Sequence, residues 1–423
     1  MLKFLDFFAG IGLFRLGLEK AGHICIGHCE IDKYANATYK ALHNPTKEEY
    51  FANDITKINS ENLPKADIWT GGFPCQDASV AKGASRTGLS GKRSGLFYDF
   101  INLLQSQKEE NKPTWLIIEN VRGLFSVNGT KDFGRVLYKL AESGYSVQYA
   151  LLNSKDFGVP QNRERVYLIG YKGELDKPFF PLPTVKPKPL SSILEIDVDE
   201  KYFVSKEKTE AILNNLYEDL LKRGKIEKPT GKLIELLKGS QGSRVYSTDG
   251  LSVCLSSAGG GQGAKTGLYM CSIQSGVTKA RDYSTCITSS IAHSFSPNDD
   301  NRRSFAVYTD LPRAVLTPDR VKKRQNGRRI KEGNEPVFTL TSQDIHGILQ
   351  NSRIRRLTPR ECFRLQGVTD KEFNRIKQNA LCHRGKSISD SQLYKQAGNA
   401  VTVQVVKAIG DRIREIEKEV KTI

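Results

Sequence analysis

Cys75 is the residue of this 423-residue chain whose surroundings most favour covalent chemistry. It lies in the run GGFPCQ (71–76), directly after the strand-like run ADIWT (66–70). Pro74 stiffens the approach, and the Gly-, Ser- and Lys/Arg-rich run that follows (79–95) is suited to close over a phosphate backbone. A thiolate is a strong nucleophile, although most cysteines are small buried apolar residues. The context makes Cys75 the candidate nucleophile.

Two glycines mark a second candidate site, in the run Phe8-Ala9-Gly10-Ile11-Gly12. Between a strand and a helix, glycines let backbone N–H groups approach a ligand at the helix N-terminus. A dinucleotide-binding loop would carry a third glycine at position 15, where Arg15 stands. This disfavours a pyrophosphate-bearing cofactor and leaves other adenosine cofactors open. A tight turn without a ligand is the alternative.

Two acidic residues extend the hypothesis of an adenosine pocket. Glu30 ends a predicted strand and is placed to accept both ribose hydroxyls. Asp54, followed by Ile55 in the turn-like run NDI (53–55), is placed to meet an adenine amino group. Each acid alone is more often a solvated loop charge. Only their combination with the glycines predicts a pocket.

Four potential metal ligands follow closely, namely His23, Cys25, His28 and Cys29. Side chains alternate between the two faces of a strand, so His23 and Cys25 should face one side and His28 the other. Four ligands could not converge from that geometry. We therefore predict no metal site.

Strand-like and helix-like segments alternate over the first 172 residues. The predicted strands are 3–8, 23–30, 66–73, 114–121, 145–153 and 165–172, and the predicted helices are 13–22, 95–110 and 132–144. Such alternation predicts a mostly parallel sheet covered by helices on both faces. Ligands of these sheets bind at the carboxyl ends of the strands.

The pattern changes after residue 175, and we expect a first domain at 1–175. Pro178, Pro181, Pro183, Pro187 and Pro189 predict an extended linker. The region 176–352 continues with three β-leaning runs at 244–257, 282–290 and 336–344, interpreted as strands of one irregular sheet. It is expected to form a second, smaller domain.

The C-terminal segment, 353–423, should return to the first domain. Thr358, Pro359 and Glu361 predict a helix start with a capping box. A last helix, from about Val401 to Val420, has apolar residues at helical spacing and should pack on the sheet. The domain that carries the site is therefore expected to be discontinuous.

The amino-acid composition limits the partners and the cellular compartment that the chain can have. The chain has 64 Lys and Arg against 47 Asp and Glu, a formal net charge of +17. This favours a polyanionic partner, although an ordinary basic protein would show it too. Eight scattered cysteines predict neither a disulfide scaffold nor a zinc ribbon. Without a signal-peptide pattern or an apolar run of about 20 residues, we expect a cytoplasmic protein with no membrane contact.

A basic run at 313–331 is typical of a phosphate-contacting stretch, although a solvated face would look alike. Its eight members are Arg313, Arg320, Lys322, Lys323, Arg324, Arg328, Arg329 and Lys331.

Six motifs occur in the order seen in the bacterial cytosine-5 DNA methyltransferase family, of the type II restriction-modification kind, which this chain resembles. They are FAGIG, GGFPCQ, ENVRGL, QNRER, RRLTPRECFRLQG and QAGNAV, and the resemblance covers roughly residues 1–172 and 353–423. It implies an α/β fold of the S-adenosylmethionine-dependent methyltransferase type, with a doubly wound, mostly parallel sheet and a smaller β-leaning target-recognition domain. It also implies S-adenosyl-L-methionine as cofactor and double-stranded DNA as partner.

The resemblance also implies residue roles. Cys75 would add to carbon 6 of a flipped cytosine, and Glu119 would hold a proton near ring nitrogen 3. Arg163 and Arg165, on one face of a strand-like run, would bind the cytosine carbonyl and position the catalytic loop. Asn120 would fix loop geometry. The cofactor pocket would comprise Phe8, Gly10, Ile11, Gly12, Glu30, Asp54, Ile55, Asn399 and Val401.

Departures from the family pattern are few. Leu13 replaces a further glycine, Ile31 stands where some relatives stack an aromatic ring on adenine, and Asp77 and Ala78 follow Gln76. A tRNA methyltransferase and a catalytically silent DNA-binding relative are the alternatives. We expect a monomer associated with the bacterial nucleoid, which a restriction endonuclease could accompany without a stable complex.

Overall fold

The computed structural model divides into two compact units. Unit 1 comprises Met1–Ile196, Pro336–Asp344 and Thr358–Ile423, and unit 2 comprises Asp197–Glu335 and Ile345–Leu357. The residues that the structure describes are 1–74, 95–186, 188–205, 207, 235–237, 245–247, 268–270, 313–318, 329–331, 335–340, 346–350, 353–381 and 385–420. Unit 1 is discontinuous in sequence, and its bounds differ from the expected domain limits at 175 and 353.

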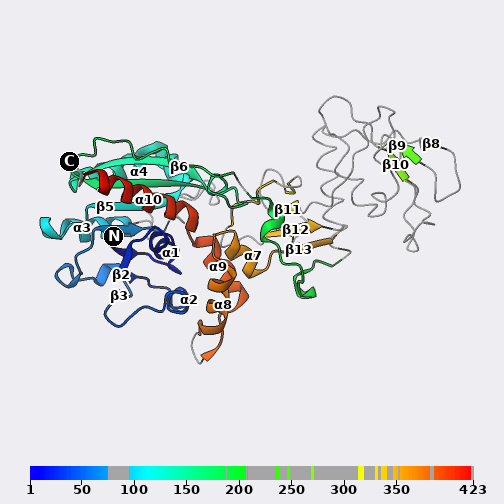
Figure 1. Cartoon of the computed structure of the whole chain (residues 1–423), viewed down its shortest axis with the longest axis horizontal. Coiled ribbons are helices and arrows are strands. Elements are labelled where there is room, and N and C mark those ends of the chain that lie inside the picture. The colour runs from blue at the N-terminus through cyan, green and yellow to red at the C-terminus, as the bar shows by residue number, and fades with distance from the viewer. Residues whose placement is uncertain are drawn as a thin grey trace. The chain divides into compact units, whose positions relative to one another are not determined.

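Unit 1 is built on a seven-stranded sheet in the order β3-β2-β1-β4-β5-β7-β6. Figure 1 labels β2, β3, β5 and β6 of this sheet. Strands β1 to β5 are parallel, whereas β7 runs antiparallel to both β5 and β6. The mostly parallel sheet of the sequence prediction is confirmed. Its strands are β1 (Lys3–Phe7), β2 (Ile24–Cys29), β3 (Tyr50–Ala52), β4 (Ile68–Gly71), β5 (Trp115–Val121), β6 (Tyr145–Asn153) and β7 (Glu164–Lys172).

The strand order reverses between β1 and β4, because the chain first adds β2 and β3 on one side and then crosses back. Such a reversal leaves a crevice at the carboxyl ends of the strands, where ligands of doubly wound sheets bind. The glycine-rich residues 8–12 follow β1 and the GGFPCQ run begins at the end of β4. The topology therefore brings the start of both candidate runs to the carboxyl ends of two neighbouring strands.

Helices cover both faces of the sheet, which explains why its central strands are apolar on both sides. On one face, Leu5 and Phe7 of β1 pack in a core with residues of α3 (Leu96–Gln105) and α4 (Lys131–Glu142). On the other face, the Trp115 indole N–H donates to Glu417 Oε1 of α10 (Val403–Val420) at 2.9 Å. Apolar strands thus need cover on both sides, and they have it.

The N-terminal half contains two elements that the sequence prediction missed, α2 (Lys33–His43) and β3. Asp32 caps α2 by accepting the backbone N–H of Tyr34, at 2.8 Å, and of Ala35. Helix α1 (Leu13–Lys20) ends two residues before the predicted end at Gly22. Helix α3 ends at Gln105, five residues before the predicted end at 110, and a separate 3-10 helix (Glu109–Asn111) follows. The other predicted strands and helices of this half are present, with bounds that differ by at most two residues.

The C-terminal segment forms α7 (Pro359–Arg364), α8 (Asp370–Asn379), α9 (Asp390–Asn399) and α10. The capping box predicted at Thr358 and Glu361 is confirmed. Helix α10 crosses α1 closely, because glycines stand at the contact: a Cβ on Gly410 would come within 2.7 Å of the Ala21 Cβ. His23 Nε2 also contacts the Gly410 carbonyl at 2.9 Å. Helix α10 therefore packs against α1 and contacts β5.

The proline-rich segment is extended, but it is not a free linker. Phe179 is fully buried, with its ring centroid 6.0 Å from that of Trp115, and Leu190 is buried as well. The run 336–344 is also part of unit 1, where Val337 forms an isolated parallel bridge with Gln161. The interpretation of this run as a strand of the middle region is wrong, because its pairing partner lies beside β7.

Unit 2 contains short strands in two three-stranded sheets. One sheet comprises β8 (Glu235–Leu237), β9 (Val245–Ser247) and β10 (Leu268–Met270), and the other comprises β11 (Arg313–Leu316), β12 (His346–Gln350) and β13 (Arg353–Arg356). The predicted strand at 282–290 and Pro187 lie outside the described residues.

Short 3-10 helices connect the main elements: Ile55–Lys57, Ser60–Asn62, Glu109–Asn111, Arg122–Phe125, Val127–Thr130, Ser154–Asp156, Leu190–Ile193 and Glu200–Tyr202. In the part of the chain that the structure describes, no helix has the length and apolar character required to cross a membrane.

Candidate active site

The glycine-rich loop after β1 has an unusual backbone. Phe8, Gly10 and Gly12 all have positive φ, at 55°, 58° and 79°. The loop closes on itself through the Gly12 N–H, which donates to the Ala9 carbonyl at 2.8 Å. A Cβ added at Gly10 would meet nothing within 4 Å, so open space adjoins the backbone there. Gly12 is the N-cap of α1 and provides no side-chain cap.

Glu30 lies directly after β2 and holds this loop. Its Oε2 accepts the Gly10 N–H at 2.7 Å, and its Oε1 accepts the Asp32 N–H at 2.7 Å. Burial raises the pKa of this carboxyl, against the lowering effect of these two hydrogen bonds. Each oxygen keeps a lone pair for a further donor. The acid and the open space at Gly10 therefore fit a ribose and its attached chain.

Asp54 and Ile55 follow the end of β3, the strand that pairs with β2. Asp54 caps a 3-10 helix, and its Oδ1 accepts the hydroxyl of Thr56 at 2.8 Å. Ile55 is buried. Burial raises the pKa of the Cys29 thiol to about 12, and the charges of Glu30 and Asp54 act in the same direction. Ile31, the neighbour of Glu30, is 72% exposed.

The QAGNAV run (396–401), at the end of α9, is linked to the N-terminal part of unit 1 by contacts between α9 and α2. Gln396 accepts the Thr38 hydroxyl at 3.0 Å and donates to the Tyr34 carbonyl at 3.0 Å. Asn399 is the last residue of α9, and Val401, two residues later, is 7% exposed. Residues separated by some 360 positions in the sequence are therefore brought to one end of the sheet.

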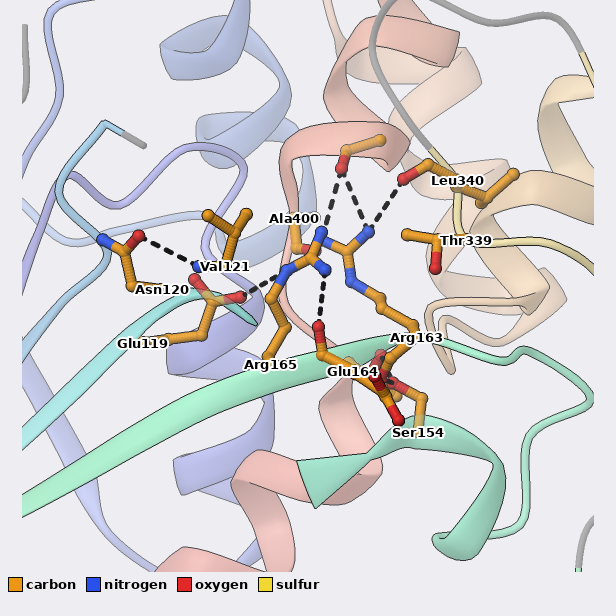
Figure 2. Close-up of polar contacts among 12 residues, drawn as sticks. Glu119, Asn120, Val121, Ser154, Arg163, Glu164, Arg165, Thr339, Leu340 and Ala400 are labelled. Carbon is orange, nitrogen blue, oxygen red and sulfur yellow. Dashed lines mark hydrogen bonds and ion pairs between the residues drawn. The ribbon is translucent and has the colours of Figure 1, made fainter. Parts of the chain in front are cut away.

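Glu119 and Arg165 form a buried ion pair on neighbouring antiparallel strands. Arg165 Nε lies 3.1 Å from Glu119 Oε1, and both side chains are largely buried (Figure 2). Burial raises the pKa of Glu119, while Arg165 and then Arg163 act in the opposite direction. The carboxyl therefore keeps a proton more readily than an exposed glutamate.

Arg163 extends to the same side of β7 as Arg165 but contacts backbone carbonyls (Figure 2). Its guanidinium donates to the carbonyls of Leu340 at 2.9 Å, Gly398 at 3.2 Å and Ala400 at 2.7 Å. The side chain is 2% exposed. These contacts join β7 to the segment at 336–344 and to the QAGNAV turn, which is a positioning role.

Asn120 holds the segment that leads to the candidate nucleophile. Its Oδ1 accepts the Val121 N–H at 2.9 Å, and its Nδ2 donates to the Phe73 carbonyl at 3.3 Å. A Cβ added at Gly72 would lie 3.6 Å from Glu119 Oε2, so this segment runs directly beside the carboxyl. Cys75, Asp77 and Ala78 lie outside the described residues.

The expected facing of the His and Cys residues of β2 is wrong. The pairing of β1 with β2 shifts register, so that Ile26 has no partner in β1. This bulge turns Cys25 and His28 to the same face, where Cys25 Sγ lies 3.6 Å from the Tyr39 hydroxyl and His28 stacks on the Tyr39 ring at 3.7 Å. Among the described residues, no group of three or more His, Cys, Asp or Glu is arranged to hold a metal.

The basic run at 313–331 is also corrected in part. Arg329 and Lys331 are buried, and Arg329 donates to the Thr317 carbonyl at 2.8 Å. These two residues therefore do not form part of an exposed phosphate-contacting surface, because the backbone around β11 holds them. Arg320, Lys322, Lys323, Arg324 and Arg328 lie outside the described residues.

Two further groups beside the glycine-rich loop were not singled out from sequence. Asp6 is fully buried, accepts the Thr70 hydroxyl at 2.6 Å, and has its pKa raised to about 7 by burial. His43, at the end of α2, contacts the Ile11 carbonyl at 3.3 Å. The only sequence signal for Asp6 is an acid inside an apolar strand, and His43 belongs to a helix that was not predicted.

Comparisons with known proteins agree with this geometry. A profile of the family C-5 cytosine-specific DNA methylase matches residues 2–415. The orphan methyltransferase M.SPRI of Bacillus phage SPR is 34% identical over 96% of both chains. The type II methyltransferase M.HhaI of Haemophilus parahaemolyticus is 35% identical over 64% of this chain and 78% of its own.

A solved structure supports the fold. The Entamoeba histolytica methyltransferase EhMeth superposes with a TM-score of 0.53 at 16% identity and covers 99% of both chains. The chain therefore belongs to the C-5 cytosine-specific DNA methylases, a family of S-adenosylmethionine-dependent transferases that act on DNA.

Proposed function

We propose that this chain methylates carbon 5 of a cytosine flipped out of duplex DNA, with Cys75 as the nucleophile. The pocket for S-adenosylmethionine comprises the loop at residues 8–12 with Glu30, Asp54, Ile55, Asn399 and Val401. Glu30 would bind the ribose hydroxyls, and Asp54 the adenine amino group. When bound, the cofactor supplies an electrophilic methyl group.

The residues at the ends of β4, β5 and β7 would activate the base. The Cys75 thiolate adds to carbon 6 of cytosine, and the displaced electron pair makes carbon 5 nucleophilic. Glu119 holds a proton at ring nitrogen 3 and so neutralises charge that develops in the adduct. After the methyl group is transferred, a base removes the carbon 5 proton, the double bond re-forms and the thiolate leaves.

Arg165 and Arg163 have different roles. Arg165 orients the Glu119 carboxyl and is placed to bind the cytosine carbonyl. Arg163 holds the QAGNAV turn against β7, which couples the cofactor pocket to the base-binding side. Asn120 keeps the segment before Cys75 next to Glu119.

The single observation that carries this proposal is the position of Glu119. This carboxyl is buried, has a raised pKa, pairs with Arg165 at 3.1 Å and adjoins Gly72, three residues before the cysteine. A structural ion pair would not require a glycine backbone beside the carboxyl. An acid able to keep a proton next to a nucleophile is what attack on cytosine carbon 6 requires.

The biological role that we propose is protection of DNA by methylation in a bacterial or phage setting. The named relatives include orphan phage enzymes and type II methyltransferases, the latter from restriction-modification systems, and a restriction endonuclease would then act on the same site. Double-stranded DNA is favoured over tRNA because these curated relatives are DNA enzymes by family. Comparing methyl incorporation into duplex DNA and into tRNA separates the two.

The decisive test traps the covalent adduct. Cys75→Ser should abolish methylation while S-adenosylmethionine binding persists, and the wild-type protein should form a stable complex with duplex DNA containing 5-fluorocytosine, because fluorine does not leave as a proton. Cys362→Ala is the control, because burial raises the pKa of that thiol well above its usual range. Turnover by the Cys75→Ser variant at the wild-type rate would refute the assignment.

A further inference from the structure

The cofactor loop adopts a backbone shape that it cannot hold alone. Three of its five residues have positive φ, and one of them is Phe8, a residue that rarely adopts this conformation. Backbone strain of this kind persists only where neighbouring groups fix it. Two groups fix it from β2 and its end: the Cys29 carbonyl accepts the Ala9 N–H at 3.0 Å, and Glu30 accepts the Gly10 N–H.

His43 fixes a third point of the loop, from the helix side. Its Nε2 lies 3.3 Å from the Ile11 carbonyl, and its side chain is 2% exposed. Burial, helped by the charge of Arg15, lowers the pKa of His43 to about 3, so the ring is neutral at neutral pH. A carbonyl oxygen only accepts hydrogen bonds, so the Ile11 contact favours the tautomer with its N–H at Nε2, while Nδ1 lies 4.0 Å from Glu19 Oε2.

The fit between His43 and the loop is close. A Cβ on Gly12 would come within 2.4 Å of His43 Nε2 and 2.6 Å of the Tyr39 ring. The two rings pack against each other with centroids 4.7 Å apart. The loop therefore lies directly against the Tyr39 and His43 rings of α2, which together form its aromatic floor. Only glycine fits at position 12.

A buried ionic network keeps this floor in place. Arg15 pairs with Glu49 at 2.6 Å and with Glu19 at 2.8 Å, and its guanidinium lies 5.6 Å from the centre of the Tyr39 ring. Its Nη1 also donates to the Tyr39 hydroxyl at 3.3 Å. Tyr39 is thus held by Arg15 and by the stacked ring of His28. His43 consequently has little freedom to move away from the Ile11 carbonyl.

We propose that His43 is a positioning residue for cofactor binding, because its Nε2–H, donated to the Ile11 carbonyl, holds residues 8–12 in the shape that receives S-adenosylmethionine. The inference deepens the proposed function and rests on cofactor binding at this loop. We expect His43 to act through the loop and to contact neither the cofactor nor the base. Its loss should therefore affect the cofactor affinity and leave the chemistry on DNA largely intact.

A matched pair of variants isolates the hydrogen bond. His43→Gln keeps an N–H donor at nearly the position of Nε2, whereas His43→Met has similar length and no donor. The dissociation constant of S-adenosylmethionine is measured by calorimetry without DNA, and kcat and the KM for duplex DNA are measured at saturating cofactor. Circular dichroism and the melting temperature report folding.

The expected result is a split between the two variants. His43→Met should weaken cofactor binding about tenfold, as the loss of about 1.4 kcal/mol would, and His43→Gln should stay within about threefold of wild type. The kcat and the KM for DNA should change less than about twofold in both. Equal cofactor affinity in His43→Met and wild type would overturn the inference.

Two controls keep the outcome interpretable. If His43→Met does not fold, His43→Asn replaces it, because its amide is too short to reach the Ile11 carbonyl, and equal affinity of the Asn and Gln variants would overturn the inference. Failure of the wild-type chain to bind S-adenosylmethionine would instead contradict the proposed function itself. The two failures are therefore distinguishable.

Discussion

Glu119 and Asp6 are both buried strand carboxyls, and their partners separate their roles. Glu119 faces a guanidinium and adjoins the backbone that leads to Cys75, so its proton is close to the proposed chemistry. Asp6 faces the Thr70 hydroxyl, a neutral donor. A neutral carboxyl suits that environment, because burial of its charged form is costly. At the scale of single residues, one acid is expected to govern rate and the other stability.

Replacing Glu119 tests the rate. Glu119→Gln should lower the methylation rate about a hundredfold or more, because an amide does not exchange a proton with ring nitrogen 3. Binding of S-adenosylmethionine should change less than about twofold. Single-turnover kinetics measures the first and calorimetry the second. Glu164→Gln, which removes an exposed ion pair with Arg122, is the control, and wild-type turnover in the Glu119 variant would contradict the assignment.

Replacing Asp6 tests the pH dependence of stability. Burial raises the pKa of Asp6 to about 7 in the folded protein, against an ordinary value of 3.8, so the folded state keeps a proton that the unfolded state releases between these values. Stability attributable to this group is therefore present at low pH and lost as pH rises from about 4 to 7, by at most about 1.4 kcal/mol per pH unit. Asp6→Asn stays neutral throughout.

The expected outcome is a gap that widens with pH. The free energy of unfolding of Asp6→Asn and of wild type is measured with urea. Relative to wild type, the variant should be more stable at pH 8 than it is at pH 5. The same change at exposed Asp176 controls for the general effect of removing a charge. A difference that is constant across this range would show that Asp6 is charged in the folded protein.

At the scale of elements, the contact between α1 and α10 depends on two glycines. A Cβ on Gly17 would lie 2.6 Å from the Val406 Cβ, and one on Gly410 would lie 2.7 Å from the Ala21 Cβ. Real Cβ atoms do not approach so closely, so the helices would have to separate. Close packing here is what returns the C-terminal helix to the sheet.

Alanine at Gly410 measures this contact. Gly410→Ala should destabilise the protein by about 1–3 kcal/mol through overpacking, although alanine favours helix formation by about 1 kcal/mol. Gly134 of α4 has nothing within 4 Å of an added Cβ, so Gly134→Ala should stabilise by about 0.5–1 kcal/mol. Chemical denaturation reports both. Stabilisation by both variants would mean that α1 and α10 adjust to the added methyl group without cost.

At the scale of the whole molecule, the excess of basic residues should govern DNA affinity. The net charge of +17 favours a polyanion, and each neutralised phosphate releases condensed counterions. Affinity of the Cys75→Ser variant for duplex DNA should fall at least about tenfold between 50 and 200 mM salt. Fluorescence anisotropy with labelled DNA measures this. An affinity independent of salt would show that phosphate contacts contribute little.

The sequence by itself determined the local structure and the chemical inventory of the site. Strands and helices of the first 172 residues, the capping box at Thr358 and the last helix were predicted because their signals act within a few residues. The order of the six motifs also identified the family. Strand β3 was missed because it has three residues, and α2 was missed because its buried face includes small and polar residues such as Ala35, Asn36 and Thr38.

Only the tertiary structure decided which residues meet. Alternation along β2 predicts the wrong facing for His28, because a bulge at Ile26 arises from pairing with β1. The partners of Arg163 are carbonyls on segments more than 170 residues away in sequence. His43 gains its role from a loop 32 residues earlier. Such pairings depend on how sheets and helices pack over long distances, and residue patterns within one element carry no information about that packing.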